Sequence, residues 1–151
     1  MNYDQDSSAI QAVIADYFRG IHEGDIETLR RVFHPQAQLF GDIKGQPYHR
    51  TLPDYLEAVR ARKSPAALGE PFRMRILSIE CVNGIASARL HCPMLGFNYH
   101  DVLALNFIES RWQVVSKLFT QAWWSTSEGW TERRDGRVPA QPRISMPEST
   151  E

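Results

Sequence analysis

The spacing of apolar residues changes along the chain from a helical repeat to a strand repeat. Apolar residues recur every three or four positions in 9–23, 26–33 and 54–62, as on one face of a helix. From residue 72 onward they mostly alternate with polar residues, which is typical of half-buried strands. Helices that precede an antiparallel sheet indicate an α+β fold.

Glycine, aspartate and proline mark the limits of the three predicted helices. Gly24 lies where the first helix would end, and Asp25 can cap the start of the second. Pro35 would stop the second helix, whereas Pro53 suits the first turn of the third. Two short strands around a glycine-rich turn are predicted between the second and third helices: 37–40 and 47–50.

The apolar stretch 97–119 predicts two long strands joined by a tight turn at residues 109–111. The first would run about eleven residues, twice an ordinary strand, and a strand of that length usually bends. Both of its faces carry apolar residues, so the sheet needs a cover on each side. We therefore expect three N-terminal helices packed in a strongly curved, mostly antiparallel sheet, with a second copy of the protein on its outer face.

Asn83-Gly84 is a strong signal for a hairpin between strands 72–82 and 85–92. The alternation of these strands fails near residues 75–76, where we expect a bulge. The hairpin therefore has one face for the core and one for water.

The composition excludes several functional classes. The 151 residues are 42% hydrophobic and 23% charged, which suits one globular domain with a real core. The net charge of −1 gives no support for a nucleic-acid or anionic-membrane surface, and no apolar run approaches the ~20 residues of a membrane span. The N-terminus lacks signal-peptide features, and Cys81 and Cys92 lie too far apart on the hairpin for a disulfide. We therefore expect a cytoplasmic protein.

We expect one domain over residues 1–122 and a C-terminal tail over 123–151. The tail begins with aromatic residues and continues as a polar, proline-containing segment, so it is predicted to be extended or partly disordered. Its tryptophans, Trp123, Trp124 and Trp130, are expected to pack on the domain or on a neighbouring subunit.

A set of residues spread over 8–120 carries a resemblance to a known family. These residues are Tyr17, Gly24-Asp25, Phe33-His34-Pro35, Tyr55, Asp101 and Trp112-Gln113-Val114-Val115-Ser116-Lys117. With this order of elements, the chain resembles the nuclear transport factor 2-like superfamily, the cone-shaped fold also called cystatin-like. More narrowly, it resembles the SnoaL-like group that includes the putative lumazine-binding family.

The resemblance implies a curved sheet wrapped around three helices, a pocket at the wide end of the cone, and a homodimer through the outer sheet face. It does not imply one function. The superfamily includes ketosteroid isomerases, dehydratases, polyketide cyclases, and adaptors without chemistry, so fold alone says little about activity.

Asp101 is the strongest candidate for chemistry, because it interrupts the more apolar row of its strand. If that row faces the pocket, Asp101 lies among Tyr99, Leu103 and Leu118 and could act as a general base or acid. Alternatively, it accepts hydrogen bonds and only orders the pocket. His34 could exchange protons at the pocket mouth, or could bond a free carbonyl at the helix end.

Tyr17 and Tyr55 lie on the inward faces of the predicted helices. Each could donate a hydrogen bond to a ligand carbonyl, or could be a core tyrosine with a satisfied hydroxyl. The remaining residues predicted to contact a ligand are Tyr99, Leu103 and Trp112. Lys117 falls on the row opposite Asp101 if no bulge intervenes, so we expect it on the dimer face or the surface.

The sequence contains no metal or cofactor motif. Its five histidines are scattered without ligand spacing, and no glycine-rich phosphate loop precedes a helix, so we predict neither metal nor cofactor. Three functions remain. The first is a small-molecule-binding protein with an apolar pocket; the second is a cofactor-free lyase or isomerase that uses Asp101 as acid or base. The third is a protein-interaction adaptor that uses the tail tryptophans.

Overall fold

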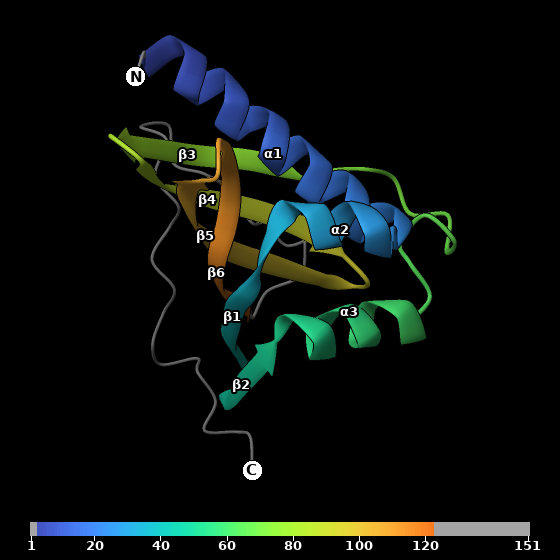
Figure 1. The fold of residues 1–151 in the computed structure, drawn as a ribbon. Coiled ribbons are helices and arrows are strands. Elements are labelled where there is room, and N and C mark those ends of the chain that lie inside the picture. The colour runs from blue at the N-terminus through green and yellow to red at the C-terminus, as the bar shows by residue number, and fades with distance from the viewer. Residues whose placement is uncertain (1–2, 123–151) are drawn as a thin grey trace.

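A computed structural model describes residues 3–122 of the chain (Figure 1). The expected tail, 123–151, lies outside the described residues. The helices are α1 (Tyr3–Glu23), α2 (Ile26–Val32) and α3 (Leu52–Ala61). The strands are β1 (Phe33–Ile43), β2 (Gln46–Thr51), β3 (Arg75–Val82), β4 (Ile85–Met94), β5 (Phe97–Ile108) and β6 (Arg111–Ala122). None of the described helices is long and apolar enough to cross a membrane.

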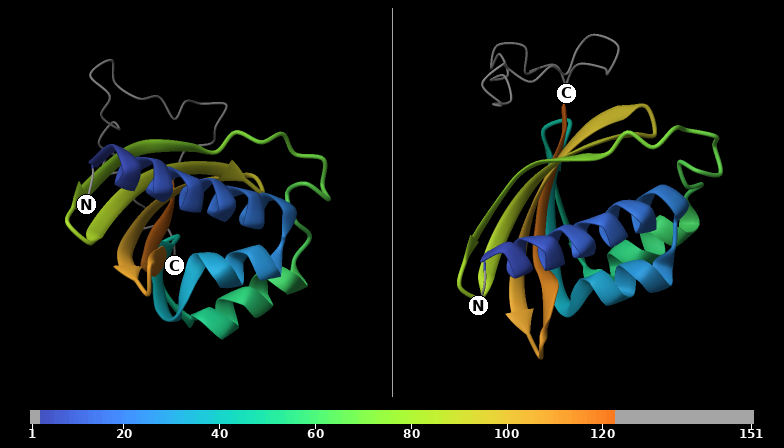
Figure 2. Two further views of the ribbon diagram at one scale, coloured as in Figure 1. Left: turned by 45° about the horizontal axis from the view of Figure 1, so that its top comes forward. Right: turned by 90° about the horizontal axis from the view of Figure 1, so that it is seen from above.

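The strands form one six-stranded sheet in the order β2-β1-β6-β5-β4-β3. The pairing of β1 with β6 is parallel and every other pairing is antiparallel, so the sheet is mixed. All three helices lie on one face of the sheet (Figure 2). This arrangement confirms the predicted α+β class.

The sheet is not strongly curled, which corrects the expected strong curvature. It stays open, with β2 and β3 as its two edges. The pairing of β4 with β5 runs from Ile85 to Met94 without a register shift, so no bulge bends the sheet there. Long strands alone do not impose strong curvature.

Strand β1 begins at Phe33, directly after α2 and earlier than the predicted strand. Phe33 caps α2 with its backbone N–H on the Leu29 carbonyl, has an extended backbone and is fully buried. The pairing of β1 with β6 is interrupted between Phe33 and Gln38, where Pro35 has no N–H to donate. The proline therefore ends the helix as predicted, but the chain continues as an irregular strand.

All three predicted pairs of antiparallel strands joined by a turn are confirmed: β1 with β2, β3 with β4, and β5 with β6. Val82 lies opposite Ile85 across the Asn83-Gly84 turn. The register of β3 shifts between Ile76 and Ser78, close to the predicted bulge. Both Cys81 and Cys92 are free thiols, as expected.

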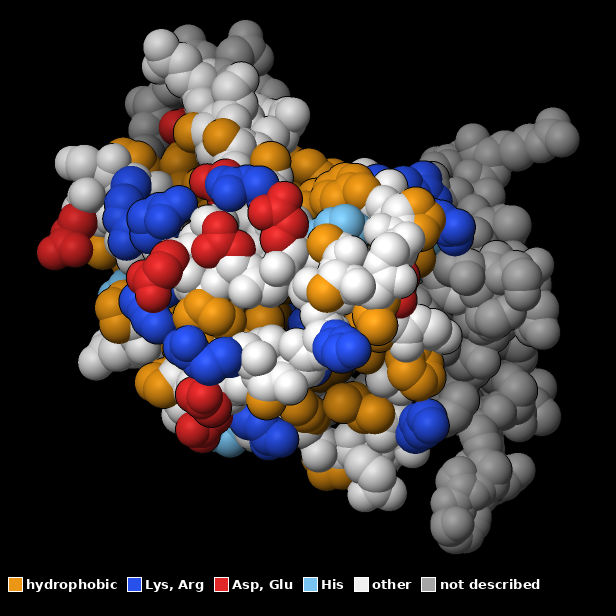
Figure 3. Space-filling model, turned by 90° about the vertical axis from the view of Figure 1, so that its right-hand side faces the viewer, with side chains coloured by type: hydrophobic (Ala, Val, Ile, Leu, Met, Phe, Trp, Pro, Cys, Tyr) orange, Lys and Arg blue, Asp and Glu red, His pale blue; other side chains and the backbone are white. Residues whose placement is uncertain are grey.

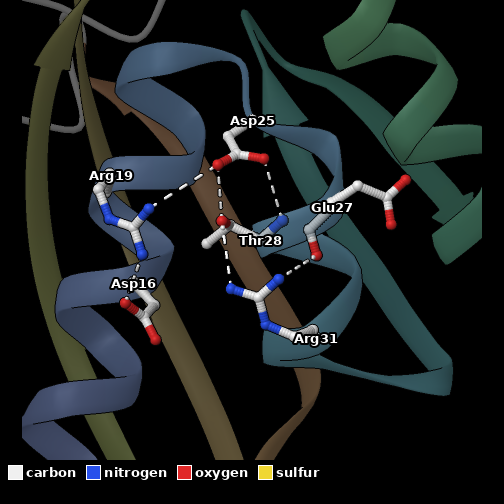
Figure 4. A network of polar contacts seen from close by, with 6 residues as sticks. All are labelled: Asp16, Arg19, Asp25, Glu27, Thr28 and Arg31. Carbon is white, nitrogen blue, oxygen red and sulfur yellow. Dashed lines mark hydrogen bonds and ion pairs between the residues drawn. The ribbon is translucent and has the colours of Figure 1, made fainter.

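The turn between α1 and α2 is held by the predicted Asp25 cap (Figure 4). Oδ1 of Asp25 accepts from the Thr28 amide at 3.1 Å, and Oδ2 accepts from the Thr28 hydroxyl at 2.7 Å. Gly20 permits the close approach of the two helices, because a Cβ there would lie 2.7 Å from the Leu29 side chain. The cap and this contact fix α2 against α1 and direct the chain into β1.

Candidate functional site

A bulge in β6 sets which side chains face the helices. Ala104 pairs with Ser116, but Leu105 pairs with Val114, so Val115 has no partner on β5. Because neighbouring strand residues point to opposite faces, this extra residue moves Lys117 onto the face that carries Asp101. The prediction of a surface Lys117 was wrong, since only 6% of it is exposed.

The same bulge corrects the expected surroundings of Asp101. Leu118, predicted to lie beside Asp101, is 56% exposed on the outer face. The residues opposite the inner row of β5 are instead Phe119, which pairs with Asp101, and Lys117, which pairs with Leu103.

These residues surround a cavity of about 80 Å³ between the inner sheet face and α3. Aromatic side chains form much of its wall, and the charged side chains come from β5, β6 and the segment after α3. The lining residues are Ile43, Tyr48, Tyr55, Arg62, Met94, Tyr99, Asp101, Lys117 and Phe119. Four of the five tyrosines in the chain lie in or directly behind this wall.

Asp101 is 2% exposed and its Oδ2 accepts two hydrogen bonds. The Tyr17 hydroxyl donates to it at 2.6 Å, and the Cys92 thiol donates to it at 3.6 Å. Burial, followed by the nearby Asp101 charge, holds the pKa of Tyr17 well above its usual range. The same two causes raise the pKa of Cys92. Both groups therefore keep their protons and act as donors that order the carboxylate.

Lys117 places its ammonium among aromatic rings. Nζ lies 3.3 Å from the Tyr55 hydroxyl, to which it donates, and 4.7 Å from the centre of the Tyr55 ring. It also lies 5.1 Å from the centre of the Phe119 ring and 5.3 Å from that of Tyr17, within the range of cation–π attraction. Burial lowers the pKa of Lys117, but attraction to the Tyr55 oxygen and the Asp101 carboxylate outweighs burial, so the net pKa is raised. Lys117 is therefore cationic at neutral pH.

Two further polar groups complete the site. Nη2 of Arg62, at the C-terminal cap of α3, is buried and has no hydrogen-bond partner among the described residues. The Tyr99 hydroxyl accepts from Nε2 of Gln121 at 3.0 Å. The site therefore has a free buried donor at Arg62, while the hydroxyls of Tyr17 and Tyr99 already have partners.

The structure brings together only some of the predicted site residues. Tyr55, Tyr99 and Asp101 line the cavity, and Tyr17 reaches it through Asp101. Leu103 is fully buried on the same sheet face but does not line the cavity. The inward helix faces of Tyr17 and Tyr55 were predicted from the sequence, whereas the structure decided which row of β5 faces the helices.

Trp112 and His34 lie away from the cavity. Trp112 packs on Phe107, 5.5 Å between ring centres, beside a separate groove of about 640 Å³ under α1 and α2. His34 is half-buried and its Nδ1 accepts from the Gln36 amide at 3.0 Å, rather than bonding a free carbonyl. His34 is therefore not among the residues that line the cavity with Asp101.

The sequence patterns did not indicate Arg62, Lys117 or Cys92 as site residues. The face of β6 on which Lys117 lies, and its pairing with Leu103, depend on the bulge at Val115. Apolar residues occur on both faces of this strand, so the sequence pattern does not reveal the bulge. Arg62 lies in a polar loop sequence without any distinguishing pattern. Across residues 3–122, no group of three or more His, Cys, Asp or Glu side chains could hold a metal ion.

Solved structures share this fold. A protein of unknown function from Shewanella baltica, described as NTF2-like, is 27% identical, with a TM-score of 0.73 over 82% of this chain and 99% of that chain. An NTF2-like protein of unknown function from Silicibacter pomeroyi is 21% identical, with a TM-score of 0.70 over 81% and 100%. A cystatin-like fold protein from Burkholderia xenovorans is 13% identical, with a TM-score of 0.57 over 78% and 92%.

The predicted resemblance is therefore confirmed at the level of the fold. No curated protein matches the chain. A family model described as "Putative lumazine-binding" matches residues 5–120, which include α2, α3 and every residue of the cavity wall. The chain therefore belongs to the family described as "Putative lumazine-binding".

Proposed function

We propose that this protein binds a small organic molecule in the cavity at Asp101 and Lys117. The observation that carries the proposal is a buried carboxylate and a buried ammonium facing one cavity. Burying charge is costly unless it is compensated, so charged groups around a cavity are typical of binding and catalytic sites. The family description, lumazine-binding, also supports a small ligand.

The size of the cavity restricts the ligand. About 80 Å³ is below the ~300 Å³ at the lower end of ordinary ligand pockets. A ligand as large as lumazine would need half-buried side chains at the cavity edge, such as Tyr48 and Arg62, to move outward. A smaller ligand could bind with the walls in place.

A second candidate function is a cofactor-free lyase or isomerase, either SnoaL-like or ketosteroid-isomerase-like. The 2.6 Å bond from Tyr17 favours it, because a carboxylate held in one orientation is suited to removing a proton next to a carbonyl. The electron pair would pass to the carbonyl oxygen, and Lys117 or Tyr55 could stabilise the resulting enolate. In this mechanism Tyr17 orients Asp101, and a proton relay through His34 has no support from the cavity.

The remaining hypotheses concern surfaces and location. A homodimer through the outer sheet face is supported by exposed apolar side chains there, including Leu118 and Phe40. The adaptor hypothesis depends on tail tryptophans outside the described residues. A cytoplasmic location is supported by the two free thiols.

A fragment titration tests the binding proposal. We would add lumazine and a panel of small carbonyl compounds to labelled protein and follow the backbone amide signals by NMR. We expect saturable shifts at Tyr99, Lys117 and Phe119. Shifts confined to the Trp112 groove, or none with any compound, would show that the cavity is not the binding site.

A matched pair of glycine variants provides the control. A Cβ at Gly41 would lie 2.5 Å from the Phe119 ring, so Gly41→Ala should displace that ring and weaken binding. At Gly84 the nearest atom to an added Cβ is 3.8 Å away, so Gly84→Ala should bind as the wild type does. Equal binding by all three proteins would contradict a ligand next to Phe119.

A further inference from the structure

We propose that the cavity selects a small organic anion, a carboxylate or enolate, whose negative group lies between Arg62 and Lys117. This inference rests on the proposed binding function and adds the chemical class of the ligand. It is carried by a buried donor that has no acceptor.

One N–H group of Arg62 is buried without a hydrogen-bond acceptor among the described residues. A guanidinium has five N–H donors and stays protonated, and a buried donor without an acceptor is destabilising. Nη2 of Arg62 is buried at the cavity without a partner among the described residues, and none of the ion pairs among residues 3–122 includes Arg62. An oxygen of a bound ligand would satisfy this donor.

Lys117 is only partly satisfied by the protein. Its ammonium has three donors, and one of them bonds to the Tyr55 hydroxyl. The adjacent aromatic rings attract the charge but accept no ordinary hydrogen bond. A second oxygen of the same ligand could therefore accept from Nζ.

The charges around the cavity favour an anion. Arg62 and Lys117 are cationic, and Asp101 is the only Asp or Glu among the lining residues. Oδ2 of Asp101 already accepts from Tyr17 and Cys92, so these contacts direct the carboxylate toward α1 and β4. A negative group on the ligand would balance the second of the two positive charges, and repulsion would hold it away from Asp101.

The remaining lining residues indicate what the uncharged part of the ligand is like. The rings of Tyr48, Tyr55, Tyr99 and Phe119 offer apolar contacts. The volume of about 80 Å³ is far below the ~300 Å³ at the lower end of ordinary ligand pockets, so the cavity favours a ligand of few heavy atoms. The site therefore fits a short carboxylate better than a phosphate ester or a sugar.

The basic side chains on the outer surface differ from Arg62, because acidic side chains lie next to them. On the side of the molecule shown in Figure 3, Lys and Arg side chains are interleaved with Asp and Glu over much of the surface. Arg60, two residues before Arg62, illustrates this, because it pairs with Glu57 at 3.4 Å and its side chain is 56% exposed. It is a matched control for Arg62.

Propionate and propionamide test the inference, because they have nearly the same shape and differ in charge. Each would be titrated into labelled protein at constant ionic strength and pH 7, with NMR shifts of the cavity residues as the readout. We expect propionate to bind at least about tenfold more tightly, the effect of one hydrogen bond to a charged group. Arg62→Gln and Lys117→Met should each abolish this preference, whereas Arg60→Gln should retain it.

The outcomes separate the inference from the proposed function. If both compounds shift the cavity residues with equal affinity, the anion preference is wrong and the binding function stands. If neither shifts them, the inference is wrong, and the titration with lumazine and carbonyl compounds decides separately whether the binding function stands. If Arg60→Gln reduces the preference as much as Arg62→Gln does, general surface charge explains it and the inference is overturned. Amide spectra of each variant establish that it is folded, and replacing a buried cation by an apolar residue of similar volume is compatible with folding.

Discussion

At the scale of single residues, Asp101 depends on two donors from other elements. The Tyr17 hydroxyl lies 2.6 Å from Oδ2, a distance typical of hydrogen bonds to a charged oxygen. Both side chains are almost completely buried, so water cannot replace either partner. The carboxylate of Asp101 is tolerated in an apolar strand row because a tyrosine 84 residues earlier in the chain donates a hydrogen bond to it.

Tyr17→Phe tests this dependence. The variant keeps the ring but leaves Asp101 Oδ2 with only the weak thiol donor. We expect a loss of about 1–3 kcal/mol in the free energy of unfolding, the usual effect of an unsatisfied buried group. Urea denaturation measures it. The half-buried Tyr48 is the control, and Tyr48→Phe should change the stability by less than about 0.5 kcal/mol. Equal losses in the two variants would refute a special role for the Tyr17 hydroxyl.

At the scale of secondary structure, single residues fix the limits and faces of the elements. Asp25 begins α2, and the Val115 bulge decides which row of β6 is buried. The turn between β5 and β6 places Glu109 and Ser110 at φ values of 53° and 65°, in the left-handed region. A short turn is therefore retained even though neither residue is a glycine.

The Asp25 cap predicts a pH dependence of stability. Hydrogen bonds from the Thr28 hydroxyl and then the Thr28 amide lower the pKa of Asp25 below its ordinary value of 3.8. A lowered pKa means that the contribution is complete above about pH 5 and is lost as the pH falls through the folded-state value. Asn also caps helices but does not titrate, so Asp25→Asn should lose less stability between pH 5 and pH 3 than the wild type.

Thermal unfolding of both proteins across this pH range measures the difference. Asp25→Ala is the companion variant, because it should lose about 1 kcal/mol at neutral pH through the loss of the cap itself. If Asp25→Asn and the wild type lose stability in parallel below pH 5, the carboxylate does not contribute as proposed.

At the scale of the whole molecule, the helices cover one sheet face and leave the other open (Figure 2). Large apolar side chains on the open face are exposed by between 48% and 65%: Phe40, Val82, Ile85 and Leu118. Exposed apolar patches of this kind are typical of interaction surfaces. They support the proposed homodimer.

Leu118→Glu tests the dimer. If the outer faces of two copies pack together, a buried glutamate should convert the dimer to a monomer, which light scattering coupled to size exclusion would measure. Leu68 is 52% exposed in the loop after α3, so Leu68→Glu should leave the dimer intact. A monomeric wild type at the same concentration would refute the proposal.

Local patterns sufficed for much of the fold. The cap of α2 at Asp25, its end before Pro35, and the hairpin at Asn83-Gly84 were predicted because the chemistry of these residues acts within a few positions of the chain. Tyr17 and Tyr55 were assigned to inward helix faces for the same reason. Strand alternation placed Asp101 in the more apolar row of its strand, but it did not decide whether that row faces the helices.

The sequence by itself determined the order of the elements, the hairpins and which residues of β5 share a row, because periodicity and turn chemistry are local. Which of the two rows faces the helices was left open. Only the tertiary structure decided the partner of Asp101, the burial of Lys117 and the presence of Arg62 at the same cavity. A bulge that inserts one residue reverses the row of every later side chain, and its position depends on packing between strands. Contacts between residues far apart in the chain are likewise fixed only when helices and sheet pack together.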